Sequence, residues 1–220
     1  MIDYPVNLHL EDRKCLVVGG GAVGQRKIRG LLSAGARVRL VDPDLPENLP
    51  PQVEAVARSY RREDLDGVCL VFAATADRAV NARVASEAKE AGLLANIADA
   101  PSKGSFTVPA VLNRGKLMMA FSTGGGSPAF ASLARDAAAE HFGEEWAVLL
   151  EIAVALRQKR LTSPKKTEYN RAVLNSLLDT DICALIAARD RDGIDRLLRT
   201  HFGAAASLAE LEVQLPSGTP

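Results

Sequence analysis

The sequence predicts an α/β fold in which a doubly wound parallel sheet precedes a smaller region and a helical C-terminal domain. Over roughly the first hundred residues, short apolar runs alternate with segments of helical periodicity. A glycine-rich loop separates the first apolar run from the first helical segment. Beyond about residue 112 the alternation stops, and from residue 129 the pattern is mainly helical.

Five short apolar runs in the first part are predicted to be strands buried on both faces. They span residues 14–18, 37–41, 53–57, 68–74 and 93–97. Helices are predicted for 22–33 and 77–91, and Gly35 and Gly92 are placed to end them. Parallel strands joined by right-handed crossovers leave a ligand crevice at their carboxyl ends.

The second part is predicted to begin with strands at 105–108 and 116–122, separated by a loop around residues 113–115. A second glycine loop follows at 124–128, and residues 129–209 are predicted to be helical. We expect residues 215–220 to form a frayed tail.

Composition indicates an ordinary globular protein and gives no sign of a nucleic-acid or membrane partner. The 220 residues include 27 basic and 27 acidic side chains, and 47% are hydrophobic. The longest apolar run, 68–74, is far shorter than the ~20 residues that span a bilayer. The N-terminus has no secretory pattern, and the three cysteines are predicted to be reduced, buried thiols. We therefore expect a cytoplasmic protein.

The glycine loop after the first strand has the spacing of a dinucleotide site. Gly19, Gly21 and Gly24 match G-x-G-x-x-G, in which the glycines allow a tight turn, close approach of a pyrophosphate, and helix–strand packing. Ala22 and Val23 open the following helix, whose N-terminal amides favour an anion. The first part is therefore predicted to be a Rossmann-like domain.

Acidic and hydroxyl residues at two further strand ends are candidates for cofactor contacts. Asp42 lies 18 residues beyond Gly24, where a carboxylate binds ribose hydroxyls and favours NAD over NADP. A turn carboxylate within Asp42-Pro43-Asp44 is the alternative. Thr75 and Asp77 are expected on the nicotinamide side, and they could equally cap the helix that follows.

Asp99 is the predicted catalytic residue. It follows the fifth strand, so its carboxylate would point into the crevice and could take a proton beside a hydride acceptor. Asn96, on the same strand, is predicted to contact substrate. Ordinary turn chemistry before Ala100-Pro101 is an equally good explanation of Asp99. We expect this acid and the first glycine loop to open into one shared cavity.

The second glycine loop is predicted to form an anion cradle on the substrate side. Its predicted substrate-binding residues are Ser122, Thr123, Gly124, Gly125 and Ser127. The alternative is a flexible turn with a capped helix, because Pro128 suits the first helical position. The scattered histidines His9, His141 and His201 lie at no metal-ligand spacing, so we assign no metal site.

Six motifs in register resemble the precorrin-2 dehydrogenase/sirohydrochlorin ferrochelatase family, including the N-terminal module of siroheme synthases. The motifs are Pro5–Leu10, Val18–Lys27, Ala73–Asp77, Asn96–Pro101, Ser105-Phe106 and Ser122–Pro128. The resemblance is close over residues 2–150 and looser in the helical C-terminus.

This resemblance implies NAD-dependent oxidation of precorrin-2, a tetrapyrrole, to sirohydrochlorin, and in some members Fe²⁺ insertion. It places Ala22 and Val23 at the pyrophosphate, Pro43 and Asp44 beside the adenosine, and Asp99 in both reactions. It also implies a homodimer. The parts are then an NAD-binding domain at 1–112, a dimerisation and substrate-side region at 113–145, a helical domain at 146–214 and the tail.

Two other functions fit the residues. A non-enzymatic NAD(H)-sensing module needs only the first hundred residues and gives no role to Asp99 or the second loop. A dehydrogenase for a smaller anionic metabolite would use the same crevice.

Overall fold

The computed structural model describes residues 3–161, 175 and 177–216. Its chain divides into two compact units, one formed by residues 1–108 with 124–126 and the other by 109–123 with 127–220. The predicted boundaries at residues 112 and 145 remain predictions. Residues 162–174 and 176 of the predicted helical domain, and 217–220 of the tail, lie outside the described residues.

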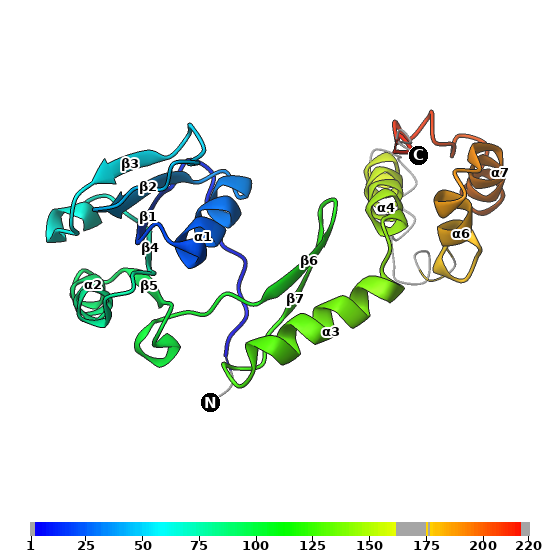
Figure 1. The fold of residues 1–220 in the computed structure, drawn as a ribbon. Helices are drawn as coiled ribbons and strands as arrows, with labels where there is room; N and C mark the ends of the chain where they lie inside the picture. Colours follow the sequence, from blue (N-terminus) through cyan, green and yellow to red (C-terminus); the bar gives the residue numbers. More distant parts are fainter. Residues whose placement is uncertain (1–2, 162–174, 176, 217–220) are drawn as a thin grey trace. The chain divides into compact units, whose positions relative to one another are not determined.

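The first unit contains the predicted parallel sheet, and the α/β fold class is confirmed (Figure 1). Its strands, in the spatial order β3-β2-β1-β4-β5, all pair in parallel. They are β1 (Lys14–Val18), β2 (Arg37–Asp42), β3 (Glu54–Ala57), β4 (Leu70–Ala73) and β5 (Leu94–Ile97). The chain order reverses direction across the sheet between β1 and β4, which is where such folds bind ligands.

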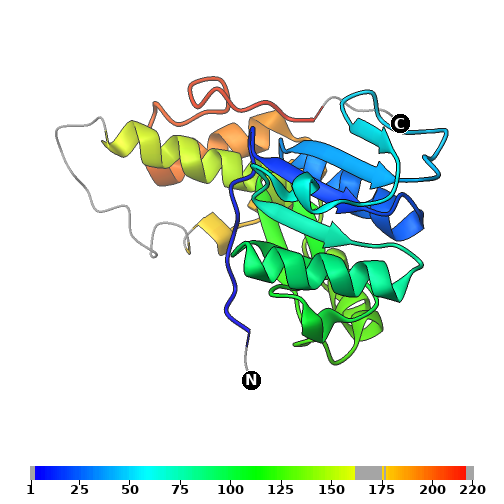
Figure 2. The same cartoon turned by 90° about the vertical axis from the view of Figure 1, so that its left-hand side faces the viewer.

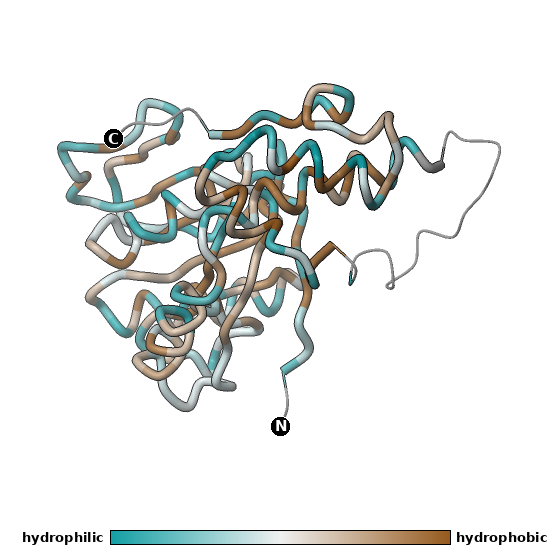
Figure 3. The backbone as a smooth tube through the Cα atoms, turned by 90° about the vertical axis from the view of Figure 1, so that its right-hand side faces the viewer, coloured by the Kyte–Doolittle hydropathy of each residue, from teal (hydrophilic) through white to brown (hydrophobic). Residues whose placement is uncertain are grey.

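Two helices cover opposite faces of this sheet. Successive side chains of a strand point to opposite faces, so Val17 of β1 packs with α1 (Ala22–Ser33) while Leu16 and Val18 pack with α2 (Arg78–Glu90). Figure 2 shows this sheet with α2 in front of the strands. Hydrophilic and hydrophobic residues alternate along the helices, as expected when one helix face is packed (Figure 3).

The prediction of two buried faces is wrong for β3. Its residues Glu54, Ala55 and Ala57 are exposed, because β3 is the edge strand of the sheet. A salt bridge of 2.5 Å joins Arg39 of β2 to Glu54, and this charged pair borders the edge. Charged side chains on an edge strand hinder pairing with another chain.

The second unit begins with an antiparallel hairpin of β6 (Ala110–Arg114) and β7 (Leu117–Phe121). The predicted strand at 105–108 is wrong, and the predicted loop around 113–115 is correct only at Gly115. Ser105 instead forms a local contact with β5, through its N–H to the Ala95 carbonyl at 2.8 Å. The turn lies at Gly115, whose φ of +55° suits glycine, so that Asn113 and Arg114 remain paired.

Four described helices follow: α3 (Pro128–His141), α4 (Glu145–Leu161), α6 (Ile182–Ala187) and α7 (Arg191–Phe202). The prediction that the helical segment continues to residue 209 is wrong. Helix α7 ends at Phe202, and the next residue, Gly203, adopts a φ of +93°. The turns beyond it still place Leu208 and Leu211 in the core with Ile152 and Ile194. Among the described residues, no helix combines the length and hydropathy needed to cross a membrane.

Candidate active site

The first glycine loop lies against the end of the neighbouring strand. Gly19 has a φ of +104°, and a Cβ at this position would stand 2.6 Å from the Ala74 carbonyl carbon and 2.7 Å from the Thr75 nitrogen. A Cβ on Gly24 would collide with the Gly19 carbonyl oxygen. Backbone packing between β1, α1 and the end of β4 therefore requires both glycines.

The loop also has an open side at the start of α1. Gly21 is the N-cap residue, has an ordinary φ of −63°, and would place a Cβ in open space. Ala22 and Val23 follow it and are exposed. A helix N-terminus with this free approach is suited to the pyrophosphate of a dinucleotide.

Asp42 joins the end of β2 to this loop. One carboxylate oxygen accepts a hydrogen bond from the Gly20 N–H at 2.5 Å, and the other accepts from the Asp44 N–H at 2.8 Å. The turn interpretation of Asp42 therefore describes real contacts. Each carboxylate oxygen has a second lone pair, so a ribose hydroxyl could still donate to Asp42. Pro43 and Asp44 are exposed beside it.

Thr75 and Asp77 lie between β4 and α2. Asp77 caps the helix by accepting from the Ala79 N–H at 2.8 Å, which is the alternative that the sequence left open. The Thr75 hydroxyl donates to the side-chain oxygen of Asn81 at 2.8 Å. Both residues thus have structural contacts at the strand end where cofactor contacts are predicted.

Asn81 connects this strand end to Asp99. Its side-chain amide donates to the Thr75 carbonyl at 3.0 Å and to Asp99 Oδ1 at 2.8 Å. Only 1% of Asn81 is exposed. Sequence reasoning missed this residue, although a polar side chain in the apolar stripe formed with Val84, Ala85 and Ala88 was a usable signal.

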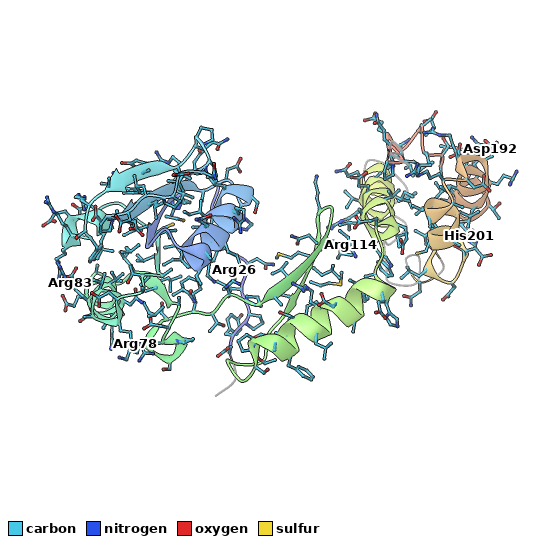
Figure 4. The ribbon with its side chains drawn as sticks, in the orientation of Figure 1. Arg26, Arg78, Arg83, Arg114, Asp192 and His201 are labelled. Atoms are coloured by element: carbon cyan, nitrogen blue, oxygen red, sulfur yellow. The ribbon has the colours of Figure 1, made fainter. Side chains whose placement is uncertain are left out.

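Asp99 borders a cleft of about 200 Å³ in the first unit. The Arg78 guanidinium, at the start of α2 in Figure 4, approaches the other carboxylate oxygen, with Nε 3.9 Å from Oδ2. The lining residues are Arg78, Asn81, Ala82, Ile97, Asp99, Ala100 and Lys103. We predicted that Asp99 and the glycine loop open into one shared cavity. That prediction is wrong for this cleft, because Asn81 is packed between Thr75 and Asp99.

Asn96 is nearly enclosed, with 7% of its surface exposed. Its side-chain amide donates to the Phe106 carbonyl at 3.0 Å and fixes the chain that follows η2 (Pro101–Lys103). The structure therefore gives Asn96 a local bracing role, and its predicted substrate contact remains a prediction.

The second glycine loop has the geometry of a capped helix start. The Ser127 N–H donates to the Thr123 hydroxyl at 3.0 Å, and the Ser127 hydroxyl accepts from the Phe130 N–H at 3.2 Å. Gly124 and Gly125 adopt φ values of +59° and +81°. These contacts match the alternative interpretation, and the role of Ser122 and its neighbours toward substrate stays a prediction.

The cysteines lie apart from these polar groups. Cys15 and Cys69 face each other at 3.9 Å between their sulfur atoms, and all three cysteines are free. Burial and the adjacent Cys69 raise the pKa of Cys15 to about 12. Because the thiolate is the nucleophilic form, Cys15 is a packing residue.

Comparison with known proteins finds similar sequences along the whole chain. Residues 6–110 match a family model described as "Putative NAD(P)-binding". The chain is 38% identical to siroheme synthase of Nitrosomonas europaea, covering 100% of this chain and 48% of that protein. It is 33% identical to siroheme synthase of Ectopseudomonas mendocina, covering 98% and 47% respectively. The chain thus spans about half the length of these relatives.

A solved structure described as "SirC, precorrin-2 dehydrogenase" is similar over nearly its whole length. The TM-score is 0.69 at 27% identity, with 86% of this chain and 96% of that chain covered. The chain is thus similar to one part of siroheme synthases and to a precorrin-2 dehydrogenase. The resemblance predicted from the six motifs is confirmed. The chemical roles of Asp99 and of the glycine loop stay predictions.

Substitutions at Gly24 and Gly21 test which loop position is needed for folding and which faces the cofactor. Gly24→Ala should destabilise the protein by about 1–3 kcal/mol, because the new methyl group overlaps the Gly19 carbonyl. Gly21→Ala, with open space at the same loop, should leave the melting temperature nearly unchanged and weaken dinucleotide binding. Thermal unfolding and cofactor titration measure both effects. Equal loss of stability in the two variants would contradict this assignment.

Proposed function

We propose that this protein oxidises precorrin-2 to sirohydrochlorin with NAD⁺. The observation that supports this most strongly is the contiguous path from Gly19 to Thr75, Asn81 and Asp99, which links the glycine loop to a carboxylate at a cleft. Loss of a hydride from a macrocycle carbon is accompanied by loss of a proton. Asp99 would take that proton.

The residues of the loop fit a dinucleotide. The pyrophosphate would lie on Gly19, Gly21, Ala22, Val23 and Gly24, where the open side of Gly21 admits it. Asp42 would accept from the ribose, with Pro43 and Asp44 beside the adenosine, and Thr75 and Asp77 would border the nicotinamide. Bound NAD⁺ supplies the hydride acceptor. A carboxylate at position 42 repels a 2′-phosphate, which favours NAD over NADP.

The proposed substrate is an anionic tetrapyrrole, and the cleft carries positive charges that would attract it. Arg78 and Lys103 line it beside Asp99. Arg78 is largely exposed, with 90% of its side chain accessible, so it can turn toward a carboxylate of the substrate. The substrate contacts proposed for Asn96, Ser122, Thr123, Gly124, Gly125 and Ser127 rest on the sequence motifs alone.

Fe²⁺ insertion into sirohydrochlorin is the second reaction that the family resemblance implies, with the metal as substrate. Insertion requires removal of protons from the pyrrole nitrogens, and Asp99 could accept them. Dehydrogenation is the activity that the loop and the carboxylate together support.

A homodimer is proposed from the surface of the second unit. Phe130 and Leu133 of α3 are 61% and 65% exposed, and Met118 of β7 is 49% exposed. A two-stranded hairpin has little stability of its own, and large exposed apolar side chains are typical of protein interfaces. The cytoplasmic location stays a prediction.

The first test is turnover. Incubation with precorrin-2 and NAD⁺ should produce NADH and the absorption spectrum of sirohydrochlorin. Asp99→Ala should lower kcat by about 10²- to 10⁴-fold, the usual range for loss of an acid–base group, with NAD⁺ affinity nearly unchanged. Cofactor binding without turnover by the unaltered protein would favour the NAD(H)-sensing alternative. An equal loss of turnover and affinity in the variant would make Asp99 structural.

The second test concerns cofactor choice. Asp42→Ala should weaken NAD⁺ binding and narrow the preference over NADP⁺, because the acceptor for the ribose hydroxyls and the repulsive charge both disappear. The measurement is the ratio of the two dissociation constants. An unchanged ratio would remove Asp42 from the ribose site and leave it as the turn carboxylate that holds Gly20 and Asp44.

The third test concerns assembly. Light scattering after gel filtration should give about twice the chain mass of 23.4 kDa. Replacing Phe130 and Leu133 together by glutamate should shift the protein to the monomer, because burying a carboxylate in an interface is costly. Thr200→Glu, an exposed change on α7, is the control and should leave the mass unaltered. A monomeric unaltered protein would contradict the proposal.

A further inference from the structure

Asn81 makes an unusually complete set of hydrogen bonds for a buried side chain. The Thr75 N–H donates to its oxygen at 3.1 Å, and the Thr75 hydroxyl hydrogen is shared between this oxygen at 2.8 Å and the Asp77 carbonyl at 2.9 Å. Its nitrogen donates to the Thr75 carbonyl and to Asp99 Oδ1. Both amide hydrogens and both oxygen lone pairs therefore have partners.

The polarity of these bonds fixes which end of the amide faces Asp99. A backbone N–H can only donate, so the group that faces the Thr75 N–H must be the oxygen of Asn81. The Thr75 carbonyl can only accept, so the NH₂ group must face it. The reversed amide would lose both contacts. Asn81 therefore presents a hydrogen-bond donor to Asp99 Oδ1, and that oxygen is an acceptor.

The two oxygens of Asp99 consequently differ. Oδ1 is occupied by the amide of Asn81, 2.8 Å away. Among the residues that the structure describes, Oδ2 has only the distant Arg78 Nε, 3.9 Å away, on an exposed side chain. Three groups line the cleft around the carboxylate from the elements packed there: Arg78 and Asn81 from α2, and Lys103 from η2.

We propose that Asn81 is a positioning residue that directs the proton of the reaction to Oδ2 of Asp99. This inference rests on the proposed function, in which Asp99 takes the substrate proton. A donor held against Oδ1 occupies that oxygen, so Oδ1 does not carry a proton toward Asn81. It also fixes the rotation of the carboxylate, so Oδ2 is the oxygen that meets the substrate.

Asn81 also connects Asp99 to the cofactor side of the site. Three of its four hydrogen bonds go to Thr75, whose nitrogen lies against the backbone of Gly19. The location of Asp99 is therefore set relative to the glycine loop by one rigid amide rather than by a flexible loop. A purely structural role would need the three bonds to Thr75 and not the fourth to Asp99.

The decisive variant is Asn81→Asp, which keeps the shape of the side chain and replaces its NH₂ group by an oxygen. That oxygen would face Oδ1 of Asp99 and the Thr75 carbonyl, so two carboxyl groups would share a proton. We expect kcat to fall at least about tenfold, with NAD⁺ affinity nearly unchanged. The acidic limb of the pH–rate profile should move to higher pH, because the shared proton must leave before Asp99 can act as a base.

A matched control separates this effect from loss of stability. Val84→Ala removes a fully buried side chain from the same helix, three residues along, and has no polar atom to offer Asp99. It should lower the melting temperature and leave kcat and the pH profile unaltered. If Asn81→Asp does not fold, Asn81→Ala replaces it, and the same fall in kcat at nearly constant NAD⁺ affinity is expected.

A second measurement needs neither substrate nor cofactor. In the full chain, the NMR signals of the Asn81 side-chain NH₂ should shift as Asp99 titrates, and this response should vanish in Asp99→Asn. The absence of turnover in the unaltered protein would refute the proposed function, and the NMR titration would then decide the contact between Asn81 and Asp99. The role given to Asn81 would be overturned if Asn81→Asp kept the kcat and the pH profile of an active unaltered protein. It would also be overturned if the NH₂ signals of Asn81 did not shift when Asp99 titrates.

Discussion

The close approach of the Gly19 loop to the end of β4 is the constraint on which the rest of the first unit depends. A side chain at Gly19 would overlap the backbone of Ala74 and Thr75, and one at Gly24 would overlap Gly19 itself. With both absent, the Gly19 N–H reaches the Val41 carbonyl at 3.0 Å and the Ala74 N–H reaches the Val18 carbonyl at 2.8 Å. The ends of β1, β2 and β4 are thereby held in one place, and they form the rim from which every proposed cofactor contact extends.

This rim also explains why a polar residue can be buried beside it. An amide removed from water without partners costs several kcal/mol on most scales, yet Asn81 is 1% exposed. The chain leaves the sheet after Ala74, so the N–H and the carbonyl of Thr75 have no strand partner. Asn81 supplies those partners, and the one amide hydrogen that remains is directed to Asp99. The structural need and the proposed chemical role are met by the same side chain.

Local patterns predicted most of the first unit, while contacts across the chain escaped them. The strands, α1, α2 and the roles of Gly19 and Gly24 follow from hydropathy and glycine spacing, which act over a few residues. Asn81 escaped because its partners, Thr75 and Asp99, are brought together only by the sheet. The predicted loop began too early for a related reason. Asn113 favours a turn by itself, but pairing with Met118 keeps it extended. The exposure of β3 likewise depends on its place at the edge, which no local pattern reveals.

The size of the cleft adds a requirement to the proposed function. Pockets that hold small ligands usually enclose about 300–1,000 Å³, and the cleft beside Asp99 is about 200 Å³. A macrocycle is broader than that space, so the cleft can receive only one edge or one side group of it. Surface beyond the seven lining residues must therefore bind the remainder of the ring. The reacting carbon would then be placed by contacts remote from Asp99, and such binding energy can be used to orient the bond that breaks.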